Sequence, residues 1–297
     1  MKTIKIIWKF SRPHTIIGSV ISITTLYLMA YDIKNSFDIT LLLLSIIVGI
    51  TCNMFIVGIN QVADLEIDKI NKPELPIPAG VLSLKQAKTI VYSALIICYL
   101  IAAYISMYLL VIVALSTFIG WAYSMPPFFL KKHHLSAAIA ISTVRGVLLN
   151  AGGFLLFNFL LNESSELTDD AEVLTMFVIA FSVVISWFKD LSDIEGDAKF
   201  KINTLAISYS PKHALVIGNI IVSLAYLYSF INTKGNDFLQ YGHVVLWALF
   251  ILNTFSIKLS EYDSVRKYYK RFWWFFFAEY LLYLADILIK IYPSIVN

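Results

Sequence analysis

The chain has 297 residues, of which 59% are hydrophobic and only 14% are charged, whereas about a quarter of the residues of an ordinary soluble domain are charged. This composition excludes a disordered chain, and a mean hydropathy of +0.75 indicates more apolar side chains than a soluble globule of this length could bury. The formal charge of +3 is too small for a nucleic-acid-binding surface, so we expect a bilayer, and no nucleic acid, as the partner.

Nine apolar stretches follow one another along the chain, and we interpret each as a helix that crosses the hydrocarbon core of a bilayer, which is about 30 Å thick. The predicted spans cover residues 16–31, 39–62, 89–107, 108–125, 135–161, 173–189, 214–231, 242–257 and 272–291. The first span follows four basic residues, as in a signal peptide, but no small-residue cleavage site is evident and eight further spans follow, so we interpret it as retained. We therefore expect an all-α membrane protein, a bundle of nine transmembrane helices in one domain covering residues 1–297.

The basic residues are distributed unequally between the two sets of connections that join these spans. Nineteen Lys and Arg residues precede the first span or lie in connections on the same side, whereas Lys34, Lys234 and Lys290 lie on the other side. Basic residues are enriched in cytoplasmic connections, so we expect the amino terminus in the cytoplasm of a cell-membrane protein and the carboxyl terminus outside. This orientation requires an odd number of spans and therefore agrees with nine.

The second span ends in a row of polar side chains. Asn60, Asp64 and Asp68 recur every four residues, so they share one face of the helix for as long as it continues. Three prolines between residues 73 and 78 then end the helix in a constrained loop. We interpret the row as oxygen ligands for a cation.

The sixth span ends in a second acidic cluster, which comprises Asp190, Asp193 and Asp197. Because both spans are even-numbered, we expect both clusters on the cytoplasmic side, where they can meet at one mouth. Carboxylates crowded at a low-dielectric boundary repel each other unless a cation lies between them. Oxygen ligands favour Mg²⁺, which commonly binds one or two carboxylates together with substrate phosphates.

A phosphate ligand would also explain the basic residues near the carboxylates, which are Lys72, Lys131, Lys132 and, inside the fifth span, Arg145. A single acidic residue at the end of a span is most often solvated charge, and Lys131 and Lys132 can be topology determinants. Two spaced acidic rows on one side argue for a shared site instead. Arg145 is costly in lipid unless it faces a polar cavity, whereas Asn150 suits a substrate contact and a contact between helices equally well.

The chemistry that these features favour is the ionisation of a lipid diphosphate. A prenyl diphosphate has a head for the polar mouth and a tail for the apolar interior, and Mg²⁺ with Lys and Arg would stabilise the departing diphosphate. The allylic cation that remains must be kept from water and can be stabilised by aromatic faces. An electron-rich acceptor would then attack the carbon, and the sequence assigns no residue to the final proton loss.

The residues described above resemble the UbiA superfamily of intramembrane prenyltransferases. Asn60, Asp64 and Asp68 match its NxxxDxxxD motif, and Asp193 and Asp197 match its DxxxD motif. Within the superfamily the chain is most similar to homogentisate prenyltransferases of the tocopherol and plastoquinone type. The segments that carry this similarity are residues 10–18, 60–73, 75–80, 123–127, 145–150 and 189–197.

This resemblance implies nine helices around a central cavity, two Mg²⁺ ions, and transfer of a prenyl group to an aromatic ring with loss of the acceptor's carboxylate. It implies that the metal ligands are Asn60 and the four catalytic aspartates, Asp64, Asp68, Asp193 and Asp197. The candidate substrate-binding residues, which are polar side chains near these ligands, are Asn60, Lys72, Tyr123, Lys131, Arg145, Asn150, Lys189 and Asp190. Of these, Lys131 and Arg145 would help to hold the diphosphate.

Three alternatives remain open. Lys201 and the pair Pro78-Ala79 depart from the homogentisate pattern, and Pro78 with the 193–205 segment is also similar to digeranylgeranylglyceryl phosphate synthases, which prenylate a glycerol phosphate lipid. An ion-coupled transporter also uses intramembrane acids and broken helices, but no inverted repeat is evident. A phosphotransferase of the CDP-alcohol type is disfavoured because its Asp-Gly-x-x-Ala-Arg opening is absent.

Overall fold

The computed structural model describes residues 2–34 and 37–291, and within these residues the regular structure is entirely helical. The long helices are α2 (Pro13–Lys34), α3 (Ile39–Ala63), α5 (Leu84–Ile105), α6 (Met107–Ser124), α9 (Asp169–Lys189), α12 (Pro211–Asn232), α13 (Asp237–Thr254) and α14 (Tyr262–Ile291). A further long run combines α7 (His134–Ser142), the π-helix η2 (Thr143–Ala151) and α8 (Gly152–Asn162). The short elements are α1 (Lys2–Phe10), α4 (Leu65–Asn71), η1 (Leu130–Lys132), η3 (Asp190–Ser192), α10 (Ile194–Lys199) and α11 (Leu205–Ser208).

Each predicted span falls on one of the long helices or on the α7-η2-α8 run. Eight helices in the described part of the chain are long and apolar enough to cross a membrane. The helix that carries the predicted span 242–257 is α13, which is not among these eight. The chain is therefore an integral membrane protein of helical architecture.

The break between the third and fourth predicted spans lies at Ser106. No turn signal is evident there in the sequence, but α5 ends at Ile105 and α6 begins at Met107. Ser106 has an extended backbone, and its hydroxyl accepts a hydrogen bond from the N–H of Leu109 at 3.1 Å. A serine in this position satisfies one of the free donors at a helix start, so one residue suffices to join two spans.

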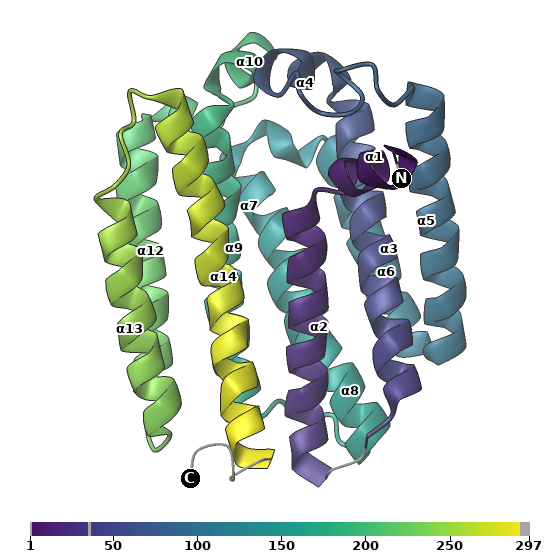
Figure 1. Ribbon diagram of the computed structural model, residues 1–297, viewed down its shortest axis with the longest axis vertical. Helices are drawn as coiled ribbons and strands as arrows, with labels where there is room; N and C mark the ends of the chain where they lie inside the picture. Colours follow the sequence, from purple (N-terminus) through teal and green to yellow (C-terminus); the bar gives the residue numbers. More distant parts are fainter. Residues whose placement is uncertain (1, 35–36, 292–297) are drawn as a thin grey trace.

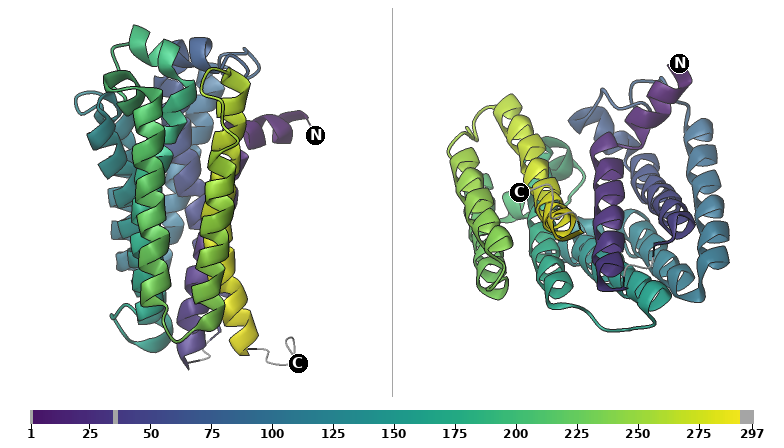
Figure 2. Two further views of the ribbon diagram at one scale, coloured as in Figure 1. Left: turned by 90° about the vertical axis from the view of Figure 1, so that its left-hand side faces the viewer. Right: turned by 60° about the horizontal axis from the view of Figure 1, so that its bottom comes forward.

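The long helices stand side by side, and the short helices α4 and α10 lie together across one end of the bundle (Figure 1). The views in Figure 2 show the long helices standing around a central region, with α1 projecting sideways near the end that carries α4 and α10. At this end α3 runs into α4, and α9 runs through η3 into α10. The chain therefore places two segments that are far apart in sequence next to each other.

Helix α9 is the most enclosed of the candidate spans, because 72% of its most apolar window is buried. It packs against α7, η2, α12 and α14. The ring of Phe181 stacks on that of Phe272 of α14, with centroids 4.3 Å apart. At Gly218 of α12 an added Cβ would lie 2.4 Å from the ring of Phe188, so only glycine permits this close approach. This packing fixes the position of the segment that follows α9.

Candidate active site

The first acidic row crosses a bend between α3 and α4. Asp64 lies at the junction, where its N–H still donates to the carbonyl oxygen of Asn60 at 2.8 Å. The N–H of Asp68 in turn donates to the carbonyl oxygen of Asp64 at 2.7 Å. The four-residue hydrogen-bond pattern thus continues through the bend, and the side-chain amide of Asn60 donates to the Asp64 carboxylate at 2.8 Å.

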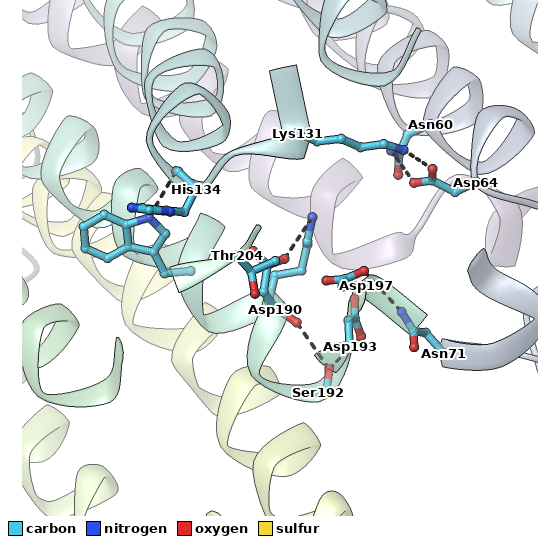
Figure 3. Close-up of polar contacts among 12 residues, drawn as sticks. Asn60, Asp64, Asn71, Lys131, His134, Asp190, Ser192, Asp193, Asp197 and Thr204 are labelled. Atoms are coloured by element: carbon cyan, nitrogen blue, oxygen red, sulfur yellow. Dashed lines mark hydrogen bonds and ion pairs between the residues drawn. The ribbon is translucent and has the colours of Figure 1, made fainter. Parts of the chain in front are cut away.

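The second acidic cluster lies on the segment that follows α9. Asp190 begins η3, Asp193 lies between η3 and α10, and Asp197 lies within α10. All three carboxylates belong to buried residues. The two acidic clusters line one polar pocket, in which the five aspartates Asp64, Asp68, Asp190, Asp193 and Asp197 take part. Figure 3 shows Asp64 facing this pocket from one side and Asp193 and Asp197 from the other.

A pair of hydrogen bonds holds the two clusters together. The side-chain oxygen of Asn71, at the end of α4, accepts from the N–H of Gly196 in α10 at 2.9 Å. The amide nitrogen of the same side chain donates to Asp197 at 3.4 Å (Figure 3). A Cβ on Gly196 would lie 2.4 Å from the Asn71 oxygen, so this contact requires glycine. We call this contact between Asn71 and Gly196 the clasp.

Three lysines face the carboxylates from separate parts of the chain. Lys131 forms an ion pair with Asp64, and Lys72 forms one with Asp193. The ammonium group of Lys189 lies 3.4 Å from Asp190 and donates to the hydroxyl of Tyr123 at 3.0 Å. The carboxylates therefore have counter-ions from the chain itself, and the described residues contain no preformed cluster of three acidic, histidine or cysteine ligands.

The pocket nevertheless has a surplus of acidic groups, because five aspartates face four cationic side chains there. Among the residues that the structure describes, one carboxylate oxygen of Asp68 is buried without a hydrogen-bond partner. Burial raises the pKa of Asp68, and burial together with the charges of Asp190 and Asp193 raises the pKa of Asp197 to about 7. Burial also acts to raise the pKa of Asp193, but the Lys72 charge and hydrogen bond hold it below its ordinary value. A divalent cation would relieve this crowding, so the donor set fits Mg²⁺.

An apolar cavity adjoins the polar pocket. Arg12, Asn60, Tyr123 and Lys189 line both spaces, so the two are continuous. The remaining wall of the cavity is mainly aliphatic, with residues such as Leu26, Ile112, Val113, Leu148 and Leu156. The site can therefore accommodate a molecule with an anionic head and a hydrocarbon tail.

Ten of the twelve predicted site residues line the polar pocket. The other two are Arg145, which lines the apolar cavity, and Asn150, which lines neither space. Lys132, a further basic residue that the sequence places near the carboxylates, is exposed at the surface. Arg12, which was not among the predicted site residues, lines both spaces and has a φ of 51° in the turn between α1 and α2. An arginine directly before a proline at the start of a span is the signal that could have identified it. Asn71 was also not predicted, because its role in the clasp depends on a partner in another part of the chain.

Asn150 lies in a contact between helices and not in either space. Its side chain is fully buried, donates to the hydroxyl of Thr175 in α9 at 2.8 Å, and accepts from the hydroxyl of Tyr280 in α14 at 2.7 Å. Of the two interpretations that the sequence left open for Asn150, the structure supports the packing contact, and the substrate contact is not supported.

Replacement of Asn150 by alanine is expected to lower the free energy of unfolding by about 1 kcal/mol, because two buried hydroxyl groups lose their partner. The Michaelis constants of the substrates should change less than twofold. Thermal unfolding in detergent and steady-state kinetics measure the two effects. Asn232→Ala is the control, since Asn232 is exposed and donates only within its own helix. A large rise in a Michaelis constant without loss of stability would show that Asn150 contacts substrate.

Comparison with known proteins gives a consistent result. Residues 21–276 match the UbiA prenyltransferase family. The chain is 36% identical over 294 residues to homogentisate phytyltransferase of Synechocystis sp., covering 95% of this chain and 96% of the relative. It is 33% identical over 290 residues to homogentisate solanesyltransferase of Arabidopsis thaliana, covering 93% and 75%. The solved structure of a UbiA homolog from Archaeoglobus fulgidus bound to GPP and Mg²⁺ has a similar fold, with a TM-score of 0.61, 16% identity, and coverage of 92% and 99%.

Proposed function

Since this chain belongs to the UbiA prenyltransferase family, we propose that it transfers a prenyl group from a prenyl diphosphate to an aromatic acceptor of the homogentisate type. The relatives named above act on homogentisate. The observation that carries the proposal is the continuity of the acidic, lysine-lined pocket with the apolar cavity through four shared residues. A prenyl diphosphate has the two chemically different ends that these two spaces require.

The carboxylates of the polar pocket are proposed to hold divalent cations, with Mg²⁺ favoured by the oxygen ligands and by the Mg²⁺ in the Archaeoglobus structure. The residues that would hold these cations are Asn60 and the motif aspartates, Asp64, Asp68, Asp193 and Asp197. Bound there, Mg²⁺ supplies positive charge that stabilises the departing diphosphate. No other step in the proposed mechanism depends on the metal directly.

The side chains of the pocket bind and orient the reactants. Arg12, Lys72, Lys131 and Lys189 lie where their N–H groups can donate to phosphate oxygens, which further stabilises the leaving group. The carbon–oxygen bond of the prenyl diphosphate breaks, and the electron pair leaves with the diphosphate. The aromatic ring of the acceptor then supplies the electrons for the new carbon–carbon bond and becomes aromatic again by losing the proton of the attacked carbon. For a homogentisate acceptor the side-chain carboxylate leaves as CO₂ and the methylene carbon takes up a proton, so the protons balance.

The allylic cation is protected by the wall of the apolar cavity. Tyr123 is shared by the two spaces and lies next to the diphosphate side, while Tyr269 and Trp273 line the cavity with their rings. Aromatic faces stabilise a cation electrostatically, and the aliphatic remainder of the wall excludes water, which would otherwise capture the cation. These residues therefore favour transfer to the acceptor over hydrolysis.

The proposal extends to the arrangement of the chain in the membrane. We propose a single domain with nine spans, the ninth being α13, which is not among the eight candidate helices, and a cytoplasmic active site in the cell membrane. The support is the excess of basic residues in the connections on the side of the two acidic clusters. In this orientation the carboxyl terminus is on the non-cytoplasmic side of the membrane. Residues 292–297 are not part of the described structure.

The function can be tested with protein purified in detergent. We expect Mg²⁺-dependent formation of a prenylated product from homogentisate and a prenyl diphosphate, and loss of this product on chelation with EDTA. The acceptors compared are homogentisate, dihydroxynaphthoate, 4-hydroxybenzoate and geranylgeranylglyceryl phosphate, each with donors of several chain lengths. Product from geranylgeranylglyceryl phosphate alone would refute the aromatic acceptor, and substrate uptake into vesicles without covalent product would indicate a transporter.

A further inference from the structure

Arg145 lies apart from the other cations of the site. It belongs to the π-helix η2 and lines the apolar cavity but not the polar pocket. Its guanidinium carbon lies 4.8 Å from the ring centroid of Trp273 and 5.7 Å from that of Phe276. The guanidinium thus lies over aromatic rings inside the cavity wall.

The charge of Arg145 has no acidic partner among the described residues. Lys72, Lys131 and Lys189 each lie within 4.0 Å of an aspartate oxygen, whereas no carboxylate oxygen of the described residues lies within that distance of Arg145. Aromatic rings stabilise a cation but accept no hydrogen bonds in the plane of the guanidinium. The N–H groups of Arg145 are therefore available to an anion that enters the cavity.

The neighbours of Arg145 form a site suited to a flat molecule. His14, Tyr269 and Trp273 line the same cavity, and the rings of His14 and Trp273 meet edge to face with centroids 4.9 Å apart. A planar aromatic ring packs well against such faces, and a guanidinium binds a carboxylate through two parallel hydrogen bonds. An arene that carries a carboxylate satisfies both features at once.

The substrates bring a diphosphate, a prenyl tail and an acceptor carboxylate to the site. Only the carboxylate has no binding group other than Arg145. The diphosphate is an anion, but it has its own pocket with four cationic side chains and the aspartates. The prenyl tail carries no charge and fits the aliphatic wall of the cavity. The carboxylate of the acceptor is the remaining anion.

The backbone around Arg145 is held firmly in place. At the adjacent Gly146 an added Cβ would lie 2.2 Å from the Ile179 side chain and 3.1 Å from its Cα, so α9 and η2 approach each other as closely as glycine permits. A π-helical stretch at such a position is typical of functional sites, and rigid support is what precise ligand recognition requires.

We propose that Arg145 binds the carboxylate of the aromatic acceptor and so selects acidic arenes over neutral ones. This inference rests on the proposed function and names the group by which the acceptor is recognised. It replaces the diphosphate contact that the resemblance implied for Arg145.

The first test uses the unmodified protein. Homogentisate is compared as acceptor with 2,5-dihydroxyphenylacetamide, its neutral amide of the same shape, and with methylhydroquinone, which lacks the carboxylate. Because neither neutral acceptor can lose CO₂ during transfer, the readout is KM, which we expect to be higher for both than for homogentisate by on the order of 100-fold. Equal KM values for the acid and its amide would overturn the proposal without requiring any variant.

The second test uses Arg145→Met, which retains the length of the side chain and removes its charge. We expect the KM of homogentisate to rise by on the order of 100-fold and the KM of the prenyl diphosphate to change less than twofold. The preference for the acid over its amide should disappear, and Arg145→Lys should restore part of it. A merely structural role would reduce the use of all three acceptors alike, and that result would overturn the proposal.

Arg271→Met is the matched control, because Arg271 is exposed on α14 and donates to Ser256 outside the cavity. Its kinetic constants should equal those of the unmodified protein. A rise in the KM of the prenyl diphosphate in Arg145→Met would show that Arg145 binds the diphosphate. That result would overturn this inference but not the proposed function. Failure of the unmodified protein to prenylate any aromatic acceptor would overturn the proposed function and this inference with it.

Discussion

Replacement of either Asp64 or Asp193 by alanine is expected to reduce kcat/KM by roughly 10³-fold or more, because each change removes a carboxylate that the reaction needs beside the diphosphate. Each change also leaves a lysine of the pocket without its partner, Lys131 in the first case and Lys72 in the second. The protein should still insert into the membrane, since neither aspartate belongs to the apolar packing of the bundle. Product formation and size-exclusion profiles in detergent measure the two effects.

The chain offers a control next to each of these aspartates. Glu66 lies in α4 and Glu195 in α10, and both are exposed. Glu66 pairs with Lys69 at the surface, at 2.7 Å, and such exposed pairs contribute little. Glu66→Ala and Glu195→Ala should therefore retain activity within twofold. Near-normal product from Asp64→Ala or Asp193→Ala would remove the two motifs from the mechanism.

Gly196→Ala is expected to lower kcat/KM by roughly 10²-fold because it disrupts the clasp and so displaces the two acidic clusters. A displacement of the reacting groups by about 1 Å can have an effect of this size. The new Cβ would lie 2.4 Å from the Asn71 oxygen and within 2.6 Å of two further atoms of that side chain. Asn71 must then move, and the hydrogen bond from the Gly196 N–H is lost. The two acidic clusters separate even though every carboxylate remains. Steady-state kinetics in detergent provide the measurement.

Two further variants separate this cause from a general loss of structure. Gly152→Ala is the control, since the nearest atom to the added methyl is the end of the Ile112 side chain at 3.3 Å, which can move. In the double variant Asn71→Ala, Gly196→Ala the clash is absent, so its activity should be no lower than that of Asn71→Ala alone. Additive losses in the double variant would show that the clasp does not carry the effect.

The sequence predicts much of the fold because hydropathy is decisive in lipid. The positions of the long helices follow from the apolar stretches, and the start of α6 depends on the single hydroxyl of Ser106. The π-helical form of η2 was not predictable, because it accompanies a close approach between Gly146 and α9 that local sequence does not encode. Helix α13 carries a predicted span but is not among the eight described helices that are long and apolar enough to cross a membrane, so hydropathy alone does not decide the number of spans.

The acidic part of the site was also predictable, for a different physical reason. Four-residue spacing places Asp64 and Asp68 on one side of a helix, and the parity of the spans brings them to the end that carries Asp193. The partners were not predictable, because the pairing of Lys131 with Asp64 joins residues 67 positions apart. The sequence also does not show how deep in the bundle a residue of a span lies. It therefore placed Arg145 with Lys72 and Lys131, whereas in the structure Arg145 lines the apolar cavity and the two lysines line the polar pocket.

The ion pairs of Lys131 with Asp64 and of Lys72 with Asp193 have a consequence for the resting protein. Without substrate, three of the five aspartates of the pocket are already paired with lysines, so the uncompensated negative charge is confined to Asp68 and Asp197. The arrival of a diphosphate with its cations then exchanges one set of neutral pairs for another. Binding and release of substrate would thus exchange one charged partner of each lysine for another, which limits the change in net charge at the site.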